Sequence, residues 1–399
     1  MNILVISTIF KSNIAEAISK NVFFSSLELS DNHNVTLLTP CSVEYCMKSP
    51  IGFKFINYSD NYNYNSSLSI VQNIYSLKSF LQSFLKNSSY DIVHFHIGFC
   101  FELFIISLLI KPFFSKDDIC VATIWQPFIE IKDTYKLIKI NQLKIFRYWP
   151  HFLSNSDLLL FLYRYSVPFF HKLIVSSRYQ QNQIKRFAHS NKIHRIVSGV
   201  KFDSTLENQN IFNSKKILYL GHYTPAKGVD IVLDMFEYLD KNYTLTLALS
   251  DRTNIDVITK NLRQHKNKKN ITIKGIVNVE KELFKHDLFI IPFKNSIGLS
   301  YYPNVILECF AAGLPILTTD FPVTRELIQN SVNGFIITTY NAKEVALKII
   351  KILNNPKALQ RISKNQQAIY YKKYSMVNYL FALKTFYMEL LNAKKNKTR

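Results

Sequence analysis

The stretch KNSIGLSYYPNVILECFAAGLPILTTDFPVTRELIQNSVNGFII, residues 294–337, passes from loop to helix to buried strand. Pro303 opens the helix, where its missing N–H is harmless, and Gly313 ends the helix before a second apolar run. Glu308 interrupts the otherwise apolar helix. A buried carboxylate is costly unless it accepts hydrogen bonds, and paired sugar hydroxyls are suitable donors. The stretch therefore predicts an α/β fold with a ligand-binding carboxylate. The alternative is that Glu308 caps backbone amides of a neighbouring segment.

Short apolar runs alternate with helix-length segments on both sides of this stretch, in two series separated by the polar residues 207–215. Such alternation predicts parallel sheets with helices on both faces, and 399 residues suffice for two such domains. Ligands of these folds bind at the carboxyl ends of the strands. The expected strands are Ile3–Ile6, Val35–Leu38, Ile92–Phe95, Cys120–Ile124, Leu173–Val175, Ile217–Leu220, Leu245–Ala248, Ile271–Ile273, Leu288–Ile291, Ile316–Thr318 and Gly334–Ile337.

A second candidate ligand-binding segment is KKILYLGHYTPAKGVDIVLDMF, Lys215–Phe236. A strand ends at Gly221, and Lys227-Gly228 opens an amphipathic helix. The N–H groups at a helix N-terminus and a lysine beside them together attract a diphosphate. An ordinary strand, loop and helix with a solvated lysine has the same pattern, so this segment alone leaves both readings open.

Composition restricts the partners and the compartment. The 49 basic and 28 acidic residues give a net charge of +21, which predicts attraction to an anionic partner, although a codon bias towards lysine gives the same excess. No basic stripe interleaved with aromatic residues is evident, so nucleic acid is not an expected partner. Five dispersed cysteines argue against a disulfide framework or a zinc site and for a reducing compartment.

Membrane-spanning and export signals are also weak. The N-terminal MNILVISTIFK is typical of a first strand rather than a signal peptide. The richest apolar segment, Phe99–Ile110, is too short to span a bilayer. We therefore expect a cytoplasmic protein, or one peripheral on the inner face of the cytoplasmic membrane. Ile131–Arg147, with five basic residues and one acidic residue, reads either as a basic amphipathic helix on an anionic bilayer or as a helix with a solvated basic face.

Taken together, the two segments resemble the GT-B glycosyltransferases, specifically the retaining family 4 enzymes (glycosyl transferases group 1). LYLGHYTPAKGVD is similar to the family's strand–GR–x–x–x–x–KG segment, and YYPNVILECFAAGLPILTTDFPVTRELIQNSVNGFI to its P-N-x-x-x-E-A-x-A-x-G-x-P-V stretch with the following E-L-I and N-G. VSGVKFD (Val197–Asp203) and DIVHFHIG (Asp91–Gly98) resemble family signatures of the first half. The resemblance spans nearly the whole chain and is strongest over residues 214–340.

The resemblance implies a GT-B architecture, in which two doubly wound Rossmann-like domains face each other across a cleft. The implied parts are an acceptor-binding domain over residues 1–206, a linker over 207–214, a nucleotide-sugar domain over 215–375, and a final segment over 376–399. In this family the last helix commonly crosses back to the first domain, and the aromatic helical pattern of Tyr370–Leu391 fits that role.

Roles for individual residues follow from the resemblance as well. Lys227 is expected to contact the donor's diphosphate, Glu308 to bind the ribose hydroxyls, and the loop amides of residues 300–304 to face the donor sugar. The implied donor-binding residues are Gly221, His222, Lys227, Ser300, Tyr301, Pro303, Asn304 and Glu308. No cofactor is implied, since the substrate is a nucleotide sugar such as a UDP- or GDP-sugar. The absence of an Asp-x-Asp sequence predicts a metal-independent reaction.

The chain departs from the family pattern at several places. Ser300 stands where the family often has a first glutamate, and His222 where an arginine usually follows the glycine. Trp125-Gln126 replaces a histidine, and residues around Asn13 replace a Gly-Gly pair. We therefore take Asn13, Trp125 and Gln126 as candidates for the acceptor side of the site.

A histidine pair lies at the end of one expected strand. His94 and His96 are two residues apart, which places them on the same face of the strand. As metal ligands they lack a nearby third partner. By resemblance His96 is a catalytic candidate that reaches the interdomain cleft; the alternative is a buried core histidine with its polar atoms satisfied.

The function implied by the resemblance is retaining transfer of a hexose-type sugar from a nucleotide donor to a saccharide or lipid-linked saccharide acceptor. The expected setting is surface polysaccharide biosynthesis, of lipopolysaccharide or capsule. The departures at Ser300 and Trp125 motivate the alternative, a degenerate GT-B subunit that binds nucleotide sugar or a partner without turnover.

Overall fold

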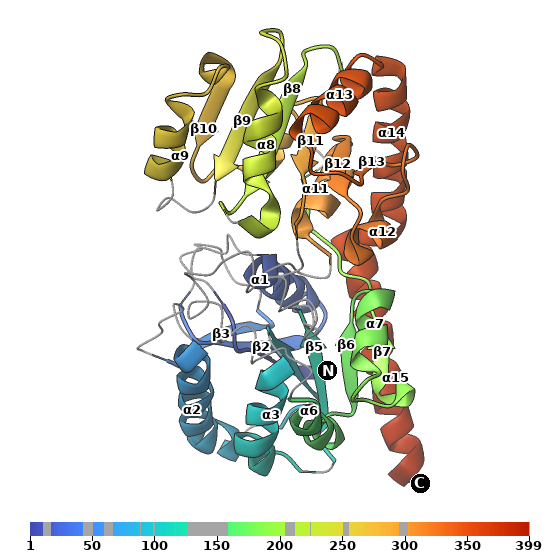
Figure 1. Ribbon diagram of the computed structural model, residues 1–399. Coiled ribbons are helices and arrows are strands. Elements are labelled where there is room, and N and C mark those ends of the chain that lie inside the picture. The colour runs from blue at the N-terminus through green and yellow to red at the C-terminus, as the bar shows by residue number, and fades with distance from the viewer. Residues whose placement is uncertain are drawn as a thin grey trace. The chain divides into compact units, whose positions relative to one another are not determined.

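A computed structural model describes most of the chain as two compact units (Figure 1). One unit holds Met1–Ser198 and Met376–Arg399, and the other holds Gly199–Gly298 and Tyr302–Ser375. The division after Ser198 comes earlier in the chain than the expected boundary at residue 206. The described residues are 1–10, 17–42, 51–59, 67–87, 89–98, 100–115, 117–125, 159–203, 212–223, 225–249, 255–294 and 302–398.

The first unit is built on a parallel sheet of seven strands in the order β3-β2-β1-β4-β5-β6-β7. Two of these, β3 and β7, are additional to the expected strands. The strands are β1 (Asn2–Ser7), β2 (Asn34–Thr39), β3 (Phe53–Asn57), β4 (Ile92–Ile97), β5 (Ile119–Ile124), β6 (Lys172–Val175) and β7 (Ile193–Arg195). The helices are α1 (Ala17–Leu29), α2 (Ser67–Phe84), α3 (Cys100–Leu109), α6 (Leu160–Ser166), α7 (Arg178–Ile184) and α15 (Met376–Thr398), with short 3-10 turns η2 (Lys111–Phe113) and η4 (Val167–Phe169).

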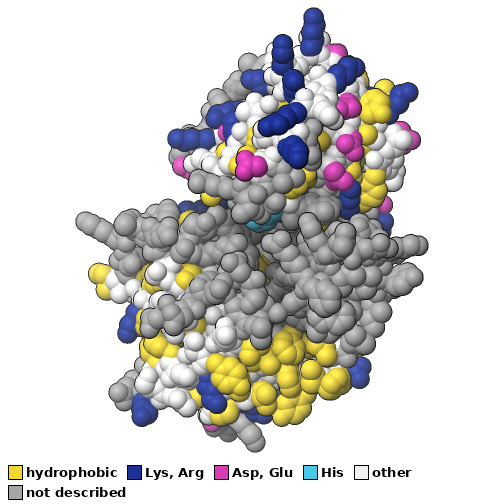
Figure 2. Space-filling model, turned by 60° about the vertical axis from the view of Figure 1, so that its left-hand side comes forward, with side chains coloured by type: hydrophobic (Ala, Val, Ile, Leu, Met, Phe, Trp, Pro, Cys, Tyr) yellow, Lys and Arg dark blue, Asp and Glu magenta, His cyan; other side chains and the backbone are white. Residues whose placement is uncertain are grey.

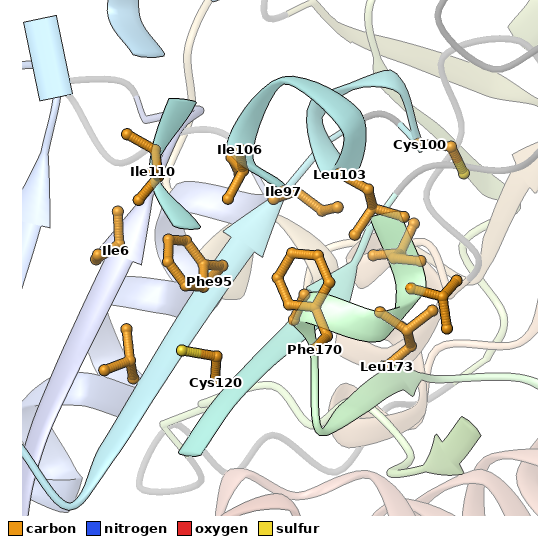
Figure 3. Packing of buried hydrophobic residues seen from close by; sticks show 14 of the residues in the cluster. Ile6, Phe95, Ile97, Cys100, Leu103, Ile106, Ile110, Cys120, Phe170 and Leu173 are labelled. Atoms are coloured by element: carbon orange, nitrogen blue, oxygen red, sulfur yellow. The ribbon is translucent and has the colours of Figure 1, made fainter. Parts of the chain in front are cut away.

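Helices cover both faces of this sheet. On one face Leu103 and Ile106 of α3 pack with Phe95 of β4 and Phe170, and α2 and α6 contribute further apolar side chains to the same core (Figure 3). On the other face α1 and α15 supply the apolar side chains. Successive side chains of a strand point to opposite faces, so a sheet with two covered faces needs the continuous apolar runs that the sequence contains.

The C-terminal helix α15 belongs to the first unit although the second unit precedes it in the chain. Its buried side chains include Tyr379, Leu383 and Tyr387, which join the core formed with α1 and the central strands. Most of the aromatic residues expected to form core in this segment are buried, whereas Tyr371 and Phe381 are exposed. The sequence-based range Tyr370–Leu391 spans two elements, since a separate π-helical turn over Tyr370–Tyr374 precedes α15.

The second unit has a parallel sheet of six strands in the order β10-β9-β8-β11-β12-β13. Every strand expected in this half is present. The strands are β8 (Lys216–Gly221), β9 (Thr244–Leu249), β10 (Ile271–Lys274), β11 (Leu288–Ile291), β12 (Ile316–Thr319) and β13 (Phe335–Ile337). The helices are α8 (Val229–Phe236), α9 (Ile255–Leu262), α10 (Val279–Leu283), α11 (Asn304–Ala312), α12 (Pro322–Leu327), α13 (Ala342–Leu353) and α14 (Pro356–Ile369), with a 3-10 turn η6 over Pro225–Lys227.

In both sheets the first strand of the chain lies inside the sheet, and later strands are added on either side of it. The chain moves from β1 to β2 and β3 and then returns to β4, and it moves from β8 to β9 and β10 and then returns to β11. Right-handed crossovers place the helices of the two directions on opposite faces. The predicted α/β class with doubly wound sheets is confirmed for both units. In the part of the chain that the structure describes, no helix combines the length and apolar character needed to cross a bilayer.

Candidate functional site

The expected donor-binding residues that are described lie at the carboxyl edge of the second unit's sheet. Here β8 and β11 are neighbours, with Ile217 opposite Leu288 and Leu218 opposite Phe289. The strand order reverses between these two strands, and such a reversal opens a crevice where α/β sheets bind ligands. The loops that leave β8 and β11 lead to α8 and α11, so both flank the same crevice.

Lys227 lies across the end of β8. A Cβ atom added to Gly221 would come within 3.3 Å of the Lys227 Cδ and 3.4 Å of its Nζ, so the lysine side chain packs on the glycine backbone. The Tyr219 hydroxyl donates a hydrogen bond of 3.1 Å to the carbonyl of His222, whose side chain is exposed. The glycine therefore leaves room for the ammonium group at the strand end.

Gly228 fixes the start of α8 against β11. It is the N-cap residue, with φ 69° and ψ 28°, a left-handed conformation that favours glycine. A Cβ atom here would lie 2.1 Å from the carbonyl oxygen of Pro292. The Lys294 backbone N–H also donates to the Ala226 carbonyl, at 2.8 Å. The loop that carries Lys227 is thus held directly on the chain leaving β11.

We predict that Gly228→Ala destabilises the second unit by about 2–4 kcal/mol, because left-handed strain adds to a collision with backbone. Gly334→Ala is the comparison, since its φ of 159° also disfavours a side chain but its Cβ would meet neighbouring atoms at 3.1–3.2 Å rather than at 2.1 Å. Thermal denaturation of both variants measures the difference. Equal melting temperatures for the two variants would show that this contact does not constrain the loop.

Two further charged residues lie at this edge and were not among the sequence-based candidates. Lys294, three residues after β11, forms an ion pair with Asp230 in the first turn of α8. The chain between β11 and Lys294 is held by hydrogen bonds to the Phe293 carbonyl, from the Thr319 hydroxyl at 2.7 Å and the Tyr340 hydroxyl at 2.8 Å. The sequence shows a lysine shortly after an apolar run, but it does not indicate the ion pair, because Asp230 is 64 positions away from Lys294.

Glu308 lies one turn into α11, and its side chain is buried, as is that of Asn304 at the start of the helix. Pro303 is the N-cap residue, in extended conformation. Burial and the negative charge of Glu308 raise the pKa of the neighbouring Cys309 thiol well above its usual value. Cys309 is therefore no thiolate nucleophile.

The loop that enters α11 is anchored at Tyr302. Its hydroxyl donates a hydrogen bond of 3.1 Å to the Glu326 carboxylate of α12, and its ring packs edge-on against Tyr374 at 6.0 Å. Ser300 and Tyr301, which directly precede it, lie outside the described residues, as do Asn13, Gln126 and the basic segment Ile131–Arg147. Those predictions stay open.

In the first unit, His96 lies at the end of β4 beside Trp125, which directly follows β5. The Trp125 Nε1–H donates to His96 Nδ1 at 3.1 Å, and the two rings stack with centroids 5.7 Å apart. The His94 ring lies 4.1 Å from that of His96, which confirms that both face the same side of the strand. Both ring nitrogens of His94 are paired, with the Tyr387 hydroxyl at 2.5 Å and the Thr123 hydroxyl at 2.7 Å. His94 is thus a satisfied core histidine.

The contact with Trp125 fixes the protonation of His96. An indole N–H can only donate, so Nδ1 of His96 must be the acceptor, and the neutral ring carries its proton on Nε2. Burial lowers the pKa of His96 to about 3. Burial also lowers the pKa of His94 well below its ordinary value, and the charge of His96 adds to this effect. His96 therefore offers an N–H donor rather than a basic nitrogen.

We predict that ¹⁵N NMR finds His96 in the neutral Nε2–H form at pH 6 and that Trp125→Phe removes this preference. Because the folded pKa lies below the ordinary 6.5, the unfolded chain binds more protons between pH 6.5 and about 3. The first unit should accordingly lose stability as the pH falls through this window. His265→Gln, in the second unit, serves as the control for the NMR assignment. An Nδ1–H signal from wild-type His96 would contradict the assigned hydrogen bond.

Metal ligands are not concentrated anywhere in the residues that the structure describes. No group of three or more His, Cys, Asp or Glu side chains among them is placed to hold a metal ion. The groups at the edge of the second unit are instead a lysine, a buried glutamate, backbone amides and an ion pair. This set suits an anionic ligand that also carries hydroxyl groups.

The sequence has recognisable relatives. Residues 203–368 match the family described as glycosyl transferases group 1. Over 252 residues the chain is 24% identical to an uncharacterized glycosyltransferase of Methanocaldococcus jannaschii, covering 60% of this chain and 69% of the relative. It is also 24% identical, over 57% of this chain and 61% of the relative, to the capsular polysaccharide biosynthesis glycosyltransferase CapM of Staphylococcus aureus.

Solved structures share the fold over almost the whole chain. Sucrose-phosphate synthase from Thermosynechococcus elongatus superposes with a TM-score of 0.77 at 13% identity, covering 98% of this chain and 100% of that one. Anabaena HepE in complex with UDP gives a TM-score of 0.69 at 13% identity with the same coverage. At such identities the likeness shows the fold. The chain therefore has the GT-B fold, and the match of its residues 203–368 to the glycosyl transferases group 1 family identifies it as a glycosyltransferase similar to that family.

Proposed function

We propose that this protein transfers a sugar from a nucleotide-sugar donor to a saccharide or lipid-linked saccharide acceptor, with retention of anomeric configuration and without a metal ion. One observation carries the proposal. Lys227 at the end of β8 and the buried Glu308 of α11 flank one edge of one sheet, where the strand order reverses. A lysine and a carboxylate in such a crevice match the two ends of a nucleoside diphosphate.

The chemistry of sugar transfer explains why these groups matter. When the bond between the anomeric carbon and the phosphate oxygen breaks, negative charge grows on the nucleoside diphosphate that leaves. A prearranged ammonium group and helix N–H groups stabilise that charge without reorganisation. Lys227 lies beside the N-terminus of α8, so both contributions are available there. Glu308 would accept hydrogen bonds from the ribose hydroxyls and so orient the nucleotide.

The relatives support a nucleotide-sugar donor and a role in surface polysaccharide synthesis. HepE is a structural neighbour that was solved with UDP, and CapM is named for capsular polysaccharide biosynthesis. UDP- and GDP-sugars share the diphosphate and the ribose that Lys227 and Glu308 would contact, so both series are tested.

Thermal shift against a panel of UDP- and GDP-sugars tests donor binding. A ligand that binds only the folded protein raises the melting temperature by mass action. We expect one base series to raise it, and we expect the bound donor to be cleaved when crude lipid acceptors are added. NMR of the product's anomeric carbon tests retention, and activity that persists in EDTA tests metal independence. If no nucleotide sugar stabilises the protein, the proposed function fails.

The buried network around His96 favours one alternative, a subunit that binds nucleotide sugar without turnover. Trp125 occupies one ring nitrogen of His96, and the ring is neutral. A histidine so held cannot act as a general base. Tight donor binding without cleavage, in the presence of every acceptor fraction, would favour this alternative over the enzyme.

A further inference from the structure

Helix α3 of the first unit is apolar on two sides. Leu103, Ile106 and Cys100 face the core beneath the sheet (Figure 3). Phe104 and Leu108 lie on another side of the helix, and Leu108 is 52% exposed. Core packing needs one apolar stripe, and a surface helix of a globular domain is normally polar on its other side. The second apolar side of α3 therefore requires a different explanation.

The neighbouring helix α6 extends the same surface. Tyr165 packs against Phe104 with ring centroids 6.2 Å apart, and Phe101 lies 6.2 Å from Phe104 in turn. Phe161, one helical turn before Tyr165, is 66% exposed, as is Tyr165 itself. We call Phe104, Leu108, Phe161 and Tyr165 the α3–α6 surface; Phe101, at its margin, also packs against the core. Figure 2 shows a continuous area of hydrophobic side chains in the lower part of the view, where these helices lie.

The exposed charges on α3, α6 and the turns that directly follow them have one sign. Over Cys100–Phe113 and Leu159–Phe170, the exposed charged side chains are the cations Lys111 and Arg164, and the one acidic residue, Glu102, is buried. Arg164 directly precedes Tyr165 in α6 and also donates to the carbonyl of Arg186, at 3.1 Å. A second copy of the chain would bring like charges together, whereas anionic lipid headgroups complement them.

We propose that the α3–α6 surface docks the protein on an anionic lipid bilayer. The aromatic and aliphatic side chains enter the interface, and Lys111 and Arg164 contact lipid phosphates. Aromatic residues flanked by cations are the composition that favours the boundary between headgroups and acyl chains. The proposal rests on the proposed function in one respect: it supplies the surface at which a lipid-linked acceptor would be reached.

Cosedimentation with vesicles of phosphatidylglycerol and phosphatidylcholine in equal parts tests the proposal on the full chain. We expect binding to these vesicles, little binding to pure phosphatidylcholine, and a loss of at least about tenfold for the double variant Leu108→Gln/Phe161→Gln. The matched control is Phe381→Gln, which removes an exposed phenylalanine of α15 that is 73% exposed. Arg164→Gln should weaken binding less and reduce its salt dependence.

Three results would overturn the docking proposal. The first is that wild-type protein does not bind anionic vesicles. The second is that the double variant binds them as well as the Phe381→Gln control does. The third is that the wild-type protein forms a concentration-dependent dimer which the double substitution dissociates. The substituted side chains are exposed, so the melting temperature of each variant verifies folding. The nucleotide-sugar thermal shift is measured on the same samples. If wild-type protein shows no thermal shift with any nucleotide sugar, only the proposed function is contradicted. If a variant that no longer binds vesicles still shows the thermal shift, the α3–α6 surface acts in membrane binding and not in donor binding.

Discussion

Lys227→Ala should lower the kcat for donor cleavage by about 10²–10³-fold while the donor's apparent affinity changes less. The ammonium group opposes charge that grows only as the anomeric bond breaks, so its removal costs more in the transition state than in the ground state. Lys227→Arg keeps the charge and should restore part of the rate. Steady-state kinetics with the nucleotide sugar found in the thermal-shift panel separates kcat from KM.

The surrounding structure makes this a clean comparison. Lys227 lies in a short turn against Gly221, where truncation to alanine removes no core packing. Lys281→Ala, an exposed lysine of α10 in the same unit, is the matched control for a general loss of positive charge. If Lys227→Ala and Lys281→Ala have the same kcat as the wild type, the diphosphate is not bound at the end of β8.

Glu308→Gln should weaken donor binding by about 10- to 100-fold and change kcat much less. Loss of charge-assisted hydrogen bonds to ribose hydroxyls costs about 1.5–3 kcal/mol, and the ribose is remote from the bond that breaks. The substitution therefore raises KM, because the lost hydrogen bonds to the ribose stabilise the ground state and the transition state equally. Glutamine keeps the volume of the buried side chain, so α11 retains its packing.

Two comparisons make the Glu308 result specific. Glu344→Gln removes an exposed carboxylate from α13 of the same unit and should leave the donor KM unchanged. A 2′-deoxyribose donor should bind wild-type protein as weakly as the natural donor binds Glu308→Gln. If Glu308→Gln lowers kcat and leaves KM untouched, the carboxylate acts in the chemical step and not on the ribose.

The sequence predicted the strands that lie inside each sheet because these are buried on both faces. Ile92–Ile97 and Ile119–Ile124 are buried along their whole length and form continuous apolar runs. The two strands that were missed lie at the edges of the first sheet. In β3, FKFIN, only the first residue is fully buried, and β7 is three residues long with one buried side chain. In β3 a lysine interrupts the apolar residues and β7 has a single apolar residue, whereas the edge strands β10 and β13 of the second sheet were predicted from the segments Ile271–Ile273 and Gly334–Ile337.

The candidate site was predictable only in part, for a related reason. Lys227 and Glu308 stand in contiguous segments whose strand, turn and helix signals are local, and Gly221, Gly228 and Gly313 occupy turns where a side chain would collide or strain the backbone. The Asp230–Lys294 pair and the Trp125–His96 bond join residues from distant segments. A single sequence contains no signal for such contacts, because they arise only when neighbouring strands bring their ends together.

The asparagine of the N-G pair at residues 333 and 334 received no separate role from the sequence, and the structure gives it a structural one. The Asn333 side chain accepts from the Gln329 backbone N–H at 2.6 Å and donates to the Leu327 carbonyl at 2.8 Å, so it closes the turn before β13. Within the described contacts its role is to shape the loop.

Calorimetric titration tests directly whether Lys227 and Glu308 bind opposite ends of the nucleotide. Wild-type, Lys227→Ala and Glu308→Gln protein are each titrated with the nucleoside diphosphate of the preferred donor and with the corresponding nucleoside. Lys227→Ala should weaken the diphosphate and leave the nucleoside unaffected, since only the diphosphate carries the charge that the lysine contacts. Glu308→Gln should weaken both ligands by the same factor, since both contain the ribose. Variants that bind both ligands as tightly as the wild type, or that exchange these two patterns, would contradict the assignment of Lys227 and Glu308 to opposite ends of the nucleotide.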